Sequence, residues 1–153
     1  MPGFANWLAR ERRSEATVLS TEDLDLLRNL DDASWPSSEN AREAAKPALL
    51  SAAATYLLTA RTAEGRPVDP VARFHLGNGA RLDRLNYLGD TSAKGLAQAH
   101  GLMVNYLYDL GAIEKNHEAF AEKGRVVASP AVQKQLKTGP VRALAPPRRP
   151  KKA

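Results

Sequence analysis

The fold of this chain depends on residues 69–80, which read Asp-Pro-Val-Ala-Arg-Phe-His-Leu-Gly-Asn-Gly-Ala. Asn78-Gly79 is a strong signal for a hairpin, because both residues accept the positive φ that tight turns need. We therefore predict a strand near residues 68–76, a tight turn, and a second strand near residues 80–88. His75 comes just before the turn, where a ligand can reach its side chain.

Helices are predicted before this hairpin. Residues 2–13 show the spacing of a short amphipathic helix, and residues 20–21 offer caps for a second one. A third helical segment covers residues 41–61. Pro47 lies inside it and favours a helix start at residues 46–47 over one unbroken helix.

Helices also predominate after the hairpin. We predict a helix over residues 93–110, a shorter one over 113–123, an edge strand over 125–129, and a final helix from Ser129-Pro130 to about residue 137. The expected fold class is α+β, with N-terminal helices, a central β-hairpin or sheet, and C-terminal helices.

Composition limits the classes of protein to consider. The 153 residues suit one domain, with 43% hydrophobic and 25% charged residues. The lack of cysteine excludes disulfides, thiolate metal sites and a cysteine nucleophile. No apolar run approaches the roughly 18 residues that span a membrane, and the first residues lack the pattern of a signal peptide. We therefore expect a cytoplasmic protein that does not enter membranes.

The positive charge is concentrated at the C-terminus. Residues 141–153 hold five of the 22 basic residues and no acid, so residues 1–140 carry 17 basic and 17 acidic residues. We predict a folded domain over residues 1–138 and a disordered, basic, proline-rich tail over 139–153. The alternative for the tail is contact with nucleic acid or another anionic surface, but it lacks interleaved aromatic residues.

A candidate phosphate site lies between the second strand and the next helix. Thr91 and Ser92 supply hydroxyls, Lys94 a cation, and Gly95 room for close backbone approach. Unpaired N–H groups and the positive end of the helix dipole suit a phosphate there. An ordinary capped helix explains the same residues, and neither a Walker motif nor a Gly-x-Gly-x-x-Gly spacing is present.

His75 is the candidate acid–base residue, with Asn78 and Asp69 nearby in the sequence. A structural histidine on a strand is the alternative. The three histidines lack the close spacing of a zinc site, so we expect no metal. Tyr106 and Tyr108 are predicted to point to different faces of the helix over 93–110. One would then pack in the core while the other reaches a cleft, although core packing alone suits both.

Several runs together resemble the C-terminal part of malonyl-CoA decarboxylase. The order and spacing match that family without gaps from His75 to Tyr108, and the resemblance covers most of residues 1–130. The matching runs are His75-Leu76-Gly77-Asn78-Gly79-Ala80, Arg84-Leu85-Asn86-Tyr87-Leu88-Gly89-Asp90-Thr91-Ser92, Gly95, and Gly101-Leu102-Met103-Val104-Asn105-Tyr106-Leu107-Tyr108.

The resemblance implies a partial acetyltransferase-like (GNAT-like) fold that binds coenzyme A, and a carbon–carbon lyase of fatty-acid metabolism. The family converts malonyl-CoA to acetyl-CoA and CO2, with the coenzyme A thioester as substrate and no separate cofactor. Loss of CO2 leaves a thioester enolate, so donors must face the thioester oxygen and a proton must reach the carbanion carbon.

Individual residues carry over from the family. His75 matches the family's histidine and Tyr108 its tyrosine, while Asn78 belongs to the same motif as His75 and would orient the site. Residues 91–95, with Thr91, Ser92, Lys94 and Gly95, match the segment expected near the coenzyme A pyrophosphate. These assignments come from the resemblance and not from spacing alone.

One departure from the family pattern matters more. Its catalytic serine belongs to a Ser-Pro-Ile-Pro-Gly-Phe motif, and here Met1 stands at the isoleucine position, so the serine would lie two residues before Met1. We therefore expect a fragment with little or no decarboxylase activity, whose hairpin presents an exposed edge or apolar face.

Two other readings stay open. One is a non-catalytic remnant that binds coenzyme A or a partner chain, and the other is a small basic nucleic-acid-binding protein. The neutral body argues against the second. The sequence also leaves open whether the chain forms a homo-oligomer.

Overall fold

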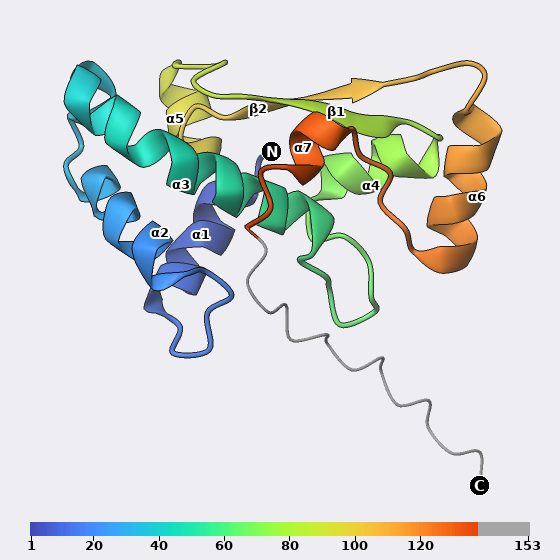
Figure 1. Ribbon diagram of the computed structural model, residues 1–153, viewed down its shortest axis with the longest axis horizontal. Coiled ribbons are helices and arrows are strands. Elements are labelled where there is room, and N and C mark those ends of the chain that lie inside the picture. The colour runs from blue at the N-terminus through green and yellow to red at the C-terminus, as the bar shows by residue number, and fades with distance from the viewer. Residues whose placement is uncertain (138–153) are drawn as a thin grey trace, which may run out of the picture.

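One antiparallel pair of strands lies along one side of the helices in the computed structural model, which describes residues 1–137 (Figure 1). The elements in chain order are α1 (Phe4–Arg13), α2 (Thr21–Leu26), 3-10 helices at Leu27–Asp31 and Trp35–Ser37, α3 (Glu39–Leu58), α4 (Pro70–Gly77), β1 (Arg81–Asn86), α5 (Ala93–Ala99), β2 (Met103–Leu107), α6 (Ile113–Lys123) and α7 (Pro130–Gln133). The described part is therefore α+β, as predicted, and the GNAT-like assignment stays a prediction. The predicted tail, residues 139–153, and its boundary at residue 138 lie outside the described residues.

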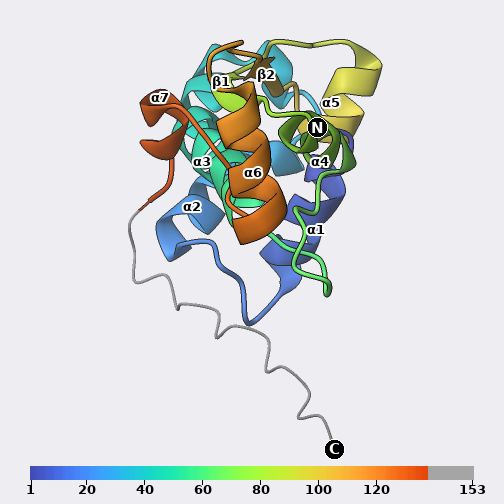
Figure 2. The same ribbon diagram turned by 90° about the vertical axis from the view of Figure 1, so that its right-hand side faces the viewer.

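The long helix α3 lies at the centre of the molecule. It contacts α1 and α2 on one side and β1 on another, so the strands and the N-terminal helices cover different faces of it (Figure 1). Residues 48–57 of α3 supply much of the core, and the fully buried residues there are Ala48, Leu49, Ala52, Ala53, Ala54, Tyr56 and Leu57. From the α6 side, β1 and β2 are seen above α3 (Figure 2).

Pro47 does not start this helix, so that prediction is wrong. The helix begins at Glu39, after Ser38, whose hydroxyl accepts a hydrogen bond from the Ala41 N–H at 3.2 Å. A proline within a helix removes one backbone hydrogen bond. Ala45 and Ala48 on either side of Pro47 are fully buried, and packing of this face offsets the loss.

The strand predicted over residues 68–76 is also wrong, because these residues form α4. Asp69 caps the helix by accepting a hydrogen bond from the Ala72 N–H at 2.9 Å, and Pro70 takes the first helical position. Ala72 and Leu76, four residues apart, are both buried. The apolar spacing and the cap thus favour a helix, while the hairpin prediction rested on the turn alone.

Asn78-Gly79 ends α4 instead of joining two strands. The Gly79 N–H donates to the Leu76 carbonyl at 3.1 Å, and the Ala80 N–H donates to the His75 carbonyl at 3.0 Å. Gly79 has a φ of 87°. These paired bonds around a left-handed glycine form a Schellman motif, which is a helix C-cap.

The turn between α4 and β1 is held by α6. The buried Asn116 amide donates to the Gly79 carbonyl at 3.2 Å, and His117 Nδ1 lies 2.7 Å from the Gly77 carbonyl oxygen. A Cβ on Gly79 would lie 2.4 Å from the Ile113 carbonyl oxygen. Glycine is therefore needed here for its φ and for the close approach of α6.

The predicted second strand is confirmed as β1, but its partner is β2. The ladder is antiparallel and runs from Arg81 opposite Leu107 to Asn86 opposite Met103, with an irregularity between Leu82 and Arg84. On the far side of β1, the Leu82 N–H donates to the Val127 carbonyl at 2.9 Å. The predicted edge strand over 125–129 is reduced to this single bridge at Leu82.

The helix predicted over residues 93–110 is wrong beyond Ala99. His100 and Gly101 have φ values of 50° and 81°, which end α5 and turn the chain into β2. Tyr106 therefore lies on a strand. The prediction for residues 113–123 is confirmed as α6, and the final helix, α7, ends at Gln133 and not near residue 137.

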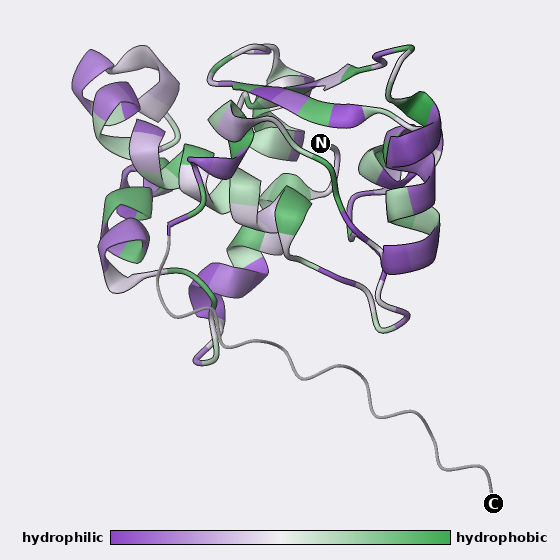
Figure 3. Cartoon of the chain, turned by 45° about the vertical axis from the view of Figure 1, so that its right-hand side comes forward, coloured by the Kyte–Doolittle hydropathy of each residue, from purple (hydrophilic) through white to green (hydrophobic). Residues whose placement is uncertain are grey.

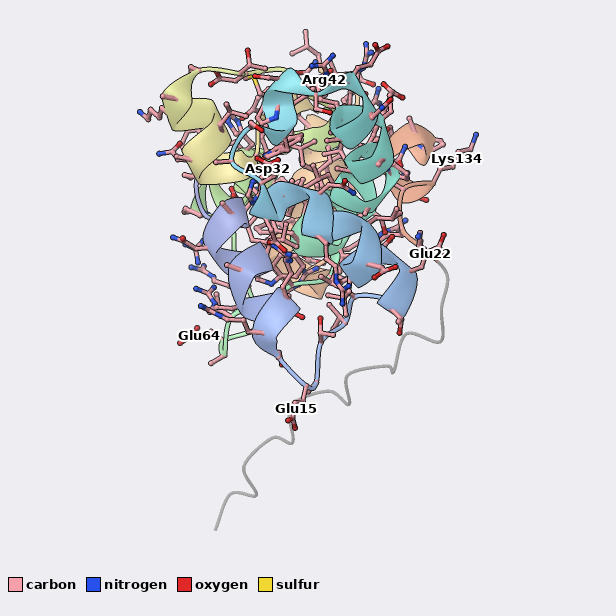
Figure 4. All side chains as sticks on the ribbon, turned by 90° about the vertical axis from the view of Figure 1, so that its left-hand side faces the viewer. Glu15, Glu22, Asp32, Arg42, Glu64 and Lys134 are labelled. Carbon is pink, nitrogen blue, oxygen red and sulfur yellow. The ribbon has the colours of Figure 1, made fainter. Side chains whose placement is uncertain are left out.

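Polar and apolar residues separate as expected for a protein with one core. Hydrophobic residues are frequent on α3, whereas α6 is largely hydrophilic (Figure 3). Of the labelled charged residues, Glu15, Glu22, Glu64 and Lys134 lie at the edge of the molecule in Figure 4. Within the described residues, no helix has both the length and the apolar character to cross a membrane.

Candidate functional site

His75 is positioned by the last turn of α4, and α4 is anchored to α3 through Asp69. The Asp69 side chain is 1% exposed and has partners on both oxygens. Oδ1 accepts from the Ala72 N–H at 2.9 Å, and Oδ2 accepts from the Tyr56 hydroxyl at 3.0 Å. A carboxylate buried in this way is satisfied by its hydrogen bonds. It therefore ties the start of the His75 helix to the centre of the molecule.

His75 Nδ1 lies 2.6 Å from the Tyr108 hydroxyl oxygen. This distance is that of a short hydrogen bond, and which atom donates depends on the tautomer of the imidazole. The two residues are 33 positions apart in the sequence. The structure therefore brings the two predicted catalytic residues into direct contact. His75 lies at the end of α4, and Tyr108 directly follows β2.

Tyr106 contacts the face of the same imidazole. The two ring centroids lie 4.3 Å apart, and the ring planes differ by 23°. Residues two apart on a strand share a face, so Tyr106 and Tyr108 both reach His75. The prediction that they point to different faces is wrong because residues 103–107 form a strand and not a helix.

The Tyr106 hydroxyl is buried and has no hydrogen-bond partner within residues 1–137. Burial raises the pKa of Tyr106, and the negative charge of Asp69 raises it further. The pKa of Tyr56 is raised in the same way, first by burial and then by Asp69. Both hydroxyls therefore stay protonated at neutral pH.

The outer side of His75 is bordered by exposed aromatic rings. The Phe74 ring stands edge-on to the His75 imidazole, with 5.2 Å between the two ring centroids. Phe74 is 64% exposed and Tyr108 is 41% exposed. His75 Nε2 has no hydrogen-bond partner among the described residues. The imidazole is therefore held by one nitrogen, while the other remains available for proton transfer.

Asn78 lies in the same turn as His75 but is not part of the hydrogen-bonded pair. Its backbone N–H donates to the His75 carbonyl at 3.1 Å as the helix ends, and its side chain is exposed. Asn78 therefore helps to end α4 through its backbone. An orienting role for its side chain stays a prediction.

The predicted phosphate-binding residues lie at the other end of the strands. Arg81 and Leu107 form the end of the ladder next to α4, whereas Asn86 and Met103 form the end next to α5 (Figure 1). Thr91, Ser92 and Lys94 are exposed at the start of α5. The structure thus brings His75 and Tyr108 together but does not bring residues 91–95 to them.

The start of α5 already contains a carboxylate. Asp90 Oδ1 accepts from the Ser92 N–H at 3.0 Å, and the Ser92 hydroxyl accepts from the Gly95 N–H at 3.1 Å. A Cβ on Gly95 would lie 2.4 Å from the Asp90 carboxyl carbon. Hydrogen bonds from Ser92 lower the pKa of Asp90, and Lys94 lowers it further. Residue 95 therefore has to be glycine because the Asp90 side chain lies against it. Phosphate binding here stays a prediction.

Sequence reasoning missed the roles of Tyr56 and Phe74. Tyr56 lies in an alanine-rich helix, where nothing in the sequence marks it as the partner of Asp69. Asp69 itself carries a readable signal, because Asp-Pro at the start of an apolar i, i+4 pattern is typical of a capped helix. Tyr106 would have been placed beside Tyr108 by the alternation of a strand.

A family model described as the malonyl-CoA decarboxylase C-terminal domain matches residues 1–145. The chain belongs to the malonyl-CoA decarboxylase family. Among curated proteins, mitochondrial malonyl-CoA decarboxylase of Anser anser anser is 34% identical over 152 residues, which cover 86% of this chain and 30% of the goose protein. The rat protein is 37% identical over 100 residues, or 65% of this chain and 20% of its own length.

Solved structures of malonyl-CoA decarboxylases are similar as well. The Rhodopseudomonas palustris protein is 53% identical with a TM-score of 0.84, over 89% of this chain and 31% of that one. The Agrobacterium vitis protein is 55% identical with the same TM-score, and this chain covers 34% of it. This chain therefore spans about a third of these malonyl-CoA decarboxylases and matches that part closely.

Proposed function

We propose that this chain supplies the proton-transfer pair of a malonyl-CoA decarboxylase, which converts malonyl-CoA to acetyl-CoA and CO2. The observation that carries the proposal is the 2.6 Å contact between His75 Nδ1 and the Tyr108 hydroxyl. It joins two residues of a family whose named members are malonyl-CoA decarboxylases. The reaction class is therefore a carbon–carbon lyase.

The proposed chemistry has two steps. The bond between the carboxylate carbon and C2 breaks, CO2 leaves, and the electron pair remains as a thioester enolate. A proton is then added to C2 to give the acetyl thioester. The His75–Tyr108 pair is suited to the second step, because its hydrogen bond lets the two residues share a proton while Tyr108 is exposed and Nε2 has no hydrogen-bond partner among the described residues.

Coenzyme A binding is a separate part of the proposal. Thr91, Ser92, Lys94 and Gly95 would contact the pyrophosphate, with Lys94 supplying the positive charge. Asn78 would orient the reacting end. Asp90 opposes an anion at this position, so Lys94 has to outweigh that carboxylate. Location in the cytoplasm also stays a prediction, and curated relatives from goose, rat and mouse are named as mitochondrial proteins.

A chimera tests the proposal. Residues 1–137 of this chain would replace the matching part of the Rhodopseudomonas palustris protein, and acetyl-CoA formation would be measured. We expect the chimera to be active and His75→Gln to lower kcat by about 10²- to 10⁴-fold, the usual contribution of general acid–base catalysis. His117→Gln is the control, because glutamine can still donate to the Gly77 carbonyl. Equal activity of the two variants would overturn the proposal.

Purified residues 1–153 provide the second arm. We expect little or no turnover, because this chain spans about a third of the solved relatives. Turnover that His75→Gln abolishes would contradict the view that the pair works only within a larger site. Binding of coenzyme A without turnover in either protein would favour the non-catalytic alternative.

A further inference from the structure

We infer that Tyr106 is a positioning residue that holds the imidazole plane of His75 for proton transfer. The functional side of this inference rests on the role proposed above for His75. Its structural side rests on the stacked rings alone, with centroids 4.3 Å apart and planes 23° apart. Tyr106 acts through His75 and does not itself need to touch the substrate.

The imidazole is restrained from two directions. The Tyr106 ring covers one face, while Tyr108 stands at 66° to the imidazole plane and bonds to Nδ1. The hydrogen bond fixes the direction of one nitrogen, and the stack opposes rotation of the ring about that direction. Nε2 is thereby kept in one orientation, which is the condition for efficient transfer to a bound reactant.

Tyr106 is well placed to act as a rigid support. It pairs with Leu82 in the strand ladder, and Leu82 is fully buried. The backbone of Leu82 also bonds to residues 127 and 129 on its other side, at 2.9 and 2.8 Å. The stacking ring therefore stands opposite a residue that is buried and hydrogen-bonded on its other side as well, whereas His75 comes from the end of a helix.

The ring of Tyr106, and not its hydroxyl, makes the contact with His75. The hydroxyl is buried without a partner in residues 1–137, and a buried polar group without a hydrogen bond is destabilising. Phenylalanine would keep the stacked ring and remove that cost. The inference therefore predicts that Tyr106→Phe preserves the position of His75 and that Tyr106→Leu does not.

Proton NMR on residues 1–153 tests the position of the imidazole without an activity measurement. The His75 ring signals are identified by their loss in His75→Gln. In the unmodified chain we expect NOEs between the His75 and Tyr106 rings and an upfield ring-current shift of the His75 protons. Tyr106→Phe should keep the shift and Tyr106→Leu should lose it. NOEs from His75 to Phe74 and Tyr108 alone would overturn the inference, even if Tyr106→Leu does not fold.

Kinetics in the chimera described above test the consequence for catalysis. We expect Tyr106→Leu to lower kcat by about ten- to a hundredfold with little change in KM, as mispositioning of a reacting group does, and Tyr106→Phe to restore kcat. An unchanged kcat in Tyr106→Leu would overturn the positioning role. An inactive parent chimera, or one indifferent to His75→Gln, would instead count against the proposed function and leave the NMR result to decide the structural claim.

Discussion

At the scale of single residues, Asp69 anchors the helix that carries His75. One of its carboxylate oxygens caps α4 by accepting a hydrogen bond from the Ala72 N–H. The other accepts a hydrogen bond from the hydroxyl of Tyr56 on α3. A buried carboxylate is destabilising unless its oxygens are hydrogen-bonded, and here a backbone N–H and a tyrosine hydroxyl supply those bonds. Gly3 leaves room for this arrangement, since a Cβ there would lie 2.9 Å from the Tyr56 hydroxyl oxygen.

Removing the Tyr56 hydroxyl should therefore be more costly than an ordinary tyrosine truncation. We expect Tyr56→Phe to lower the free energy of unfolding by about 1.5–3 kcal/mol, the range for a hydrogen bond to a charged group. Tyr87→Phe is the control, because its hydroxyl donates to the neutral Arg42 carbonyl at 2.6 Å, and about 1 kcal/mol is expected there. Urea unfolding measures both, and equal losses would contradict the role given to Asp69.

At the scale of secondary-structure elements, the sequence indicates some helix starts correctly but does not separate helix from strand around residues 68–76 and 100–110. Ser20 and Ser92 were identified as possible caps, and both accept the expected backbone hydrogen bond. The Asn78-Gly79 turn was located correctly, but the same pair suits a hairpin or a helix C-cap. The cap at Asp69 and the packing of α6 against Gly79 together favour the helix C-cap over the hairpin.

The end of α5 could not be predicted for a similar reason. His100 adopts a positive φ, which is uncommon for a residue other than glycine, so a local pattern rule continues the helix through it. With residues 100–110 predicted as helix, Tyr106 and Tyr108 point to different faces, so Tyr106 is not expected beside His75. The pair of His75 and Tyr108 was found through the family resemblance, whereas its stacking partner required the strand.

Gly79 offers a test at this scale, because α4, β1 and α6 meet there. Alanine would be strained at a φ of 87°, and its Cβ would lie 2.4 Å from the Ile113 carbonyl oxygen. We expect Gly79→Ala to cost more than about 2 kcal/mol of stability, since backbone strain of about 1–2 kcal/mol adds to the clash.

The matched control is Gly65→Ala. Gly65 has a φ of 81°, but a Cβ at this residue would have no other atom within 4 Å. Gly65→Ala should therefore lower the free energy of unfolding through backbone strain alone, by about 1–2 kcal/mol. If urea unfolding gave the same loss for both variants, the contact with α6 would contribute nothing to the position of the turn.

At the scale of the whole molecule, the C-terminal end of the described chain is tied back to the N-terminal helices. Lys137 Nζ lies 2.5 Å from Asp23 Oδ1 on α2, although the two residues are 114 positions apart. The Asp23 side chain is 3% exposed and that of Lys137 is 40% exposed. Hydrogen bonding to Asp23 is the main cause that raises the pKa of Lys137. This ion pair connects the segment after α7 to the opposite side of the core from β1.

Lys137→Met would remove the charge, keep most of the apolar stem, and leave a buried carboxylate without its cation. Breaking a fully buried pair costs about 3–5 kcal/mol, and the partial exposure of Lys137 reduces the expected loss to about 1–3 kcal/mol.

Lys134→Met is the control, since Lys134 has no ion pair within residues 1–137 and its side chain points away from the core (Figure 4). Adding Asp23→Asn should recover part of the loss, because the double variant no longer buries a charge. A loss in Lys137→Met no greater than in Lys134→Met, measured by urea unfolding, would mean that the two ends of the described chain are held together by apolar packing alone.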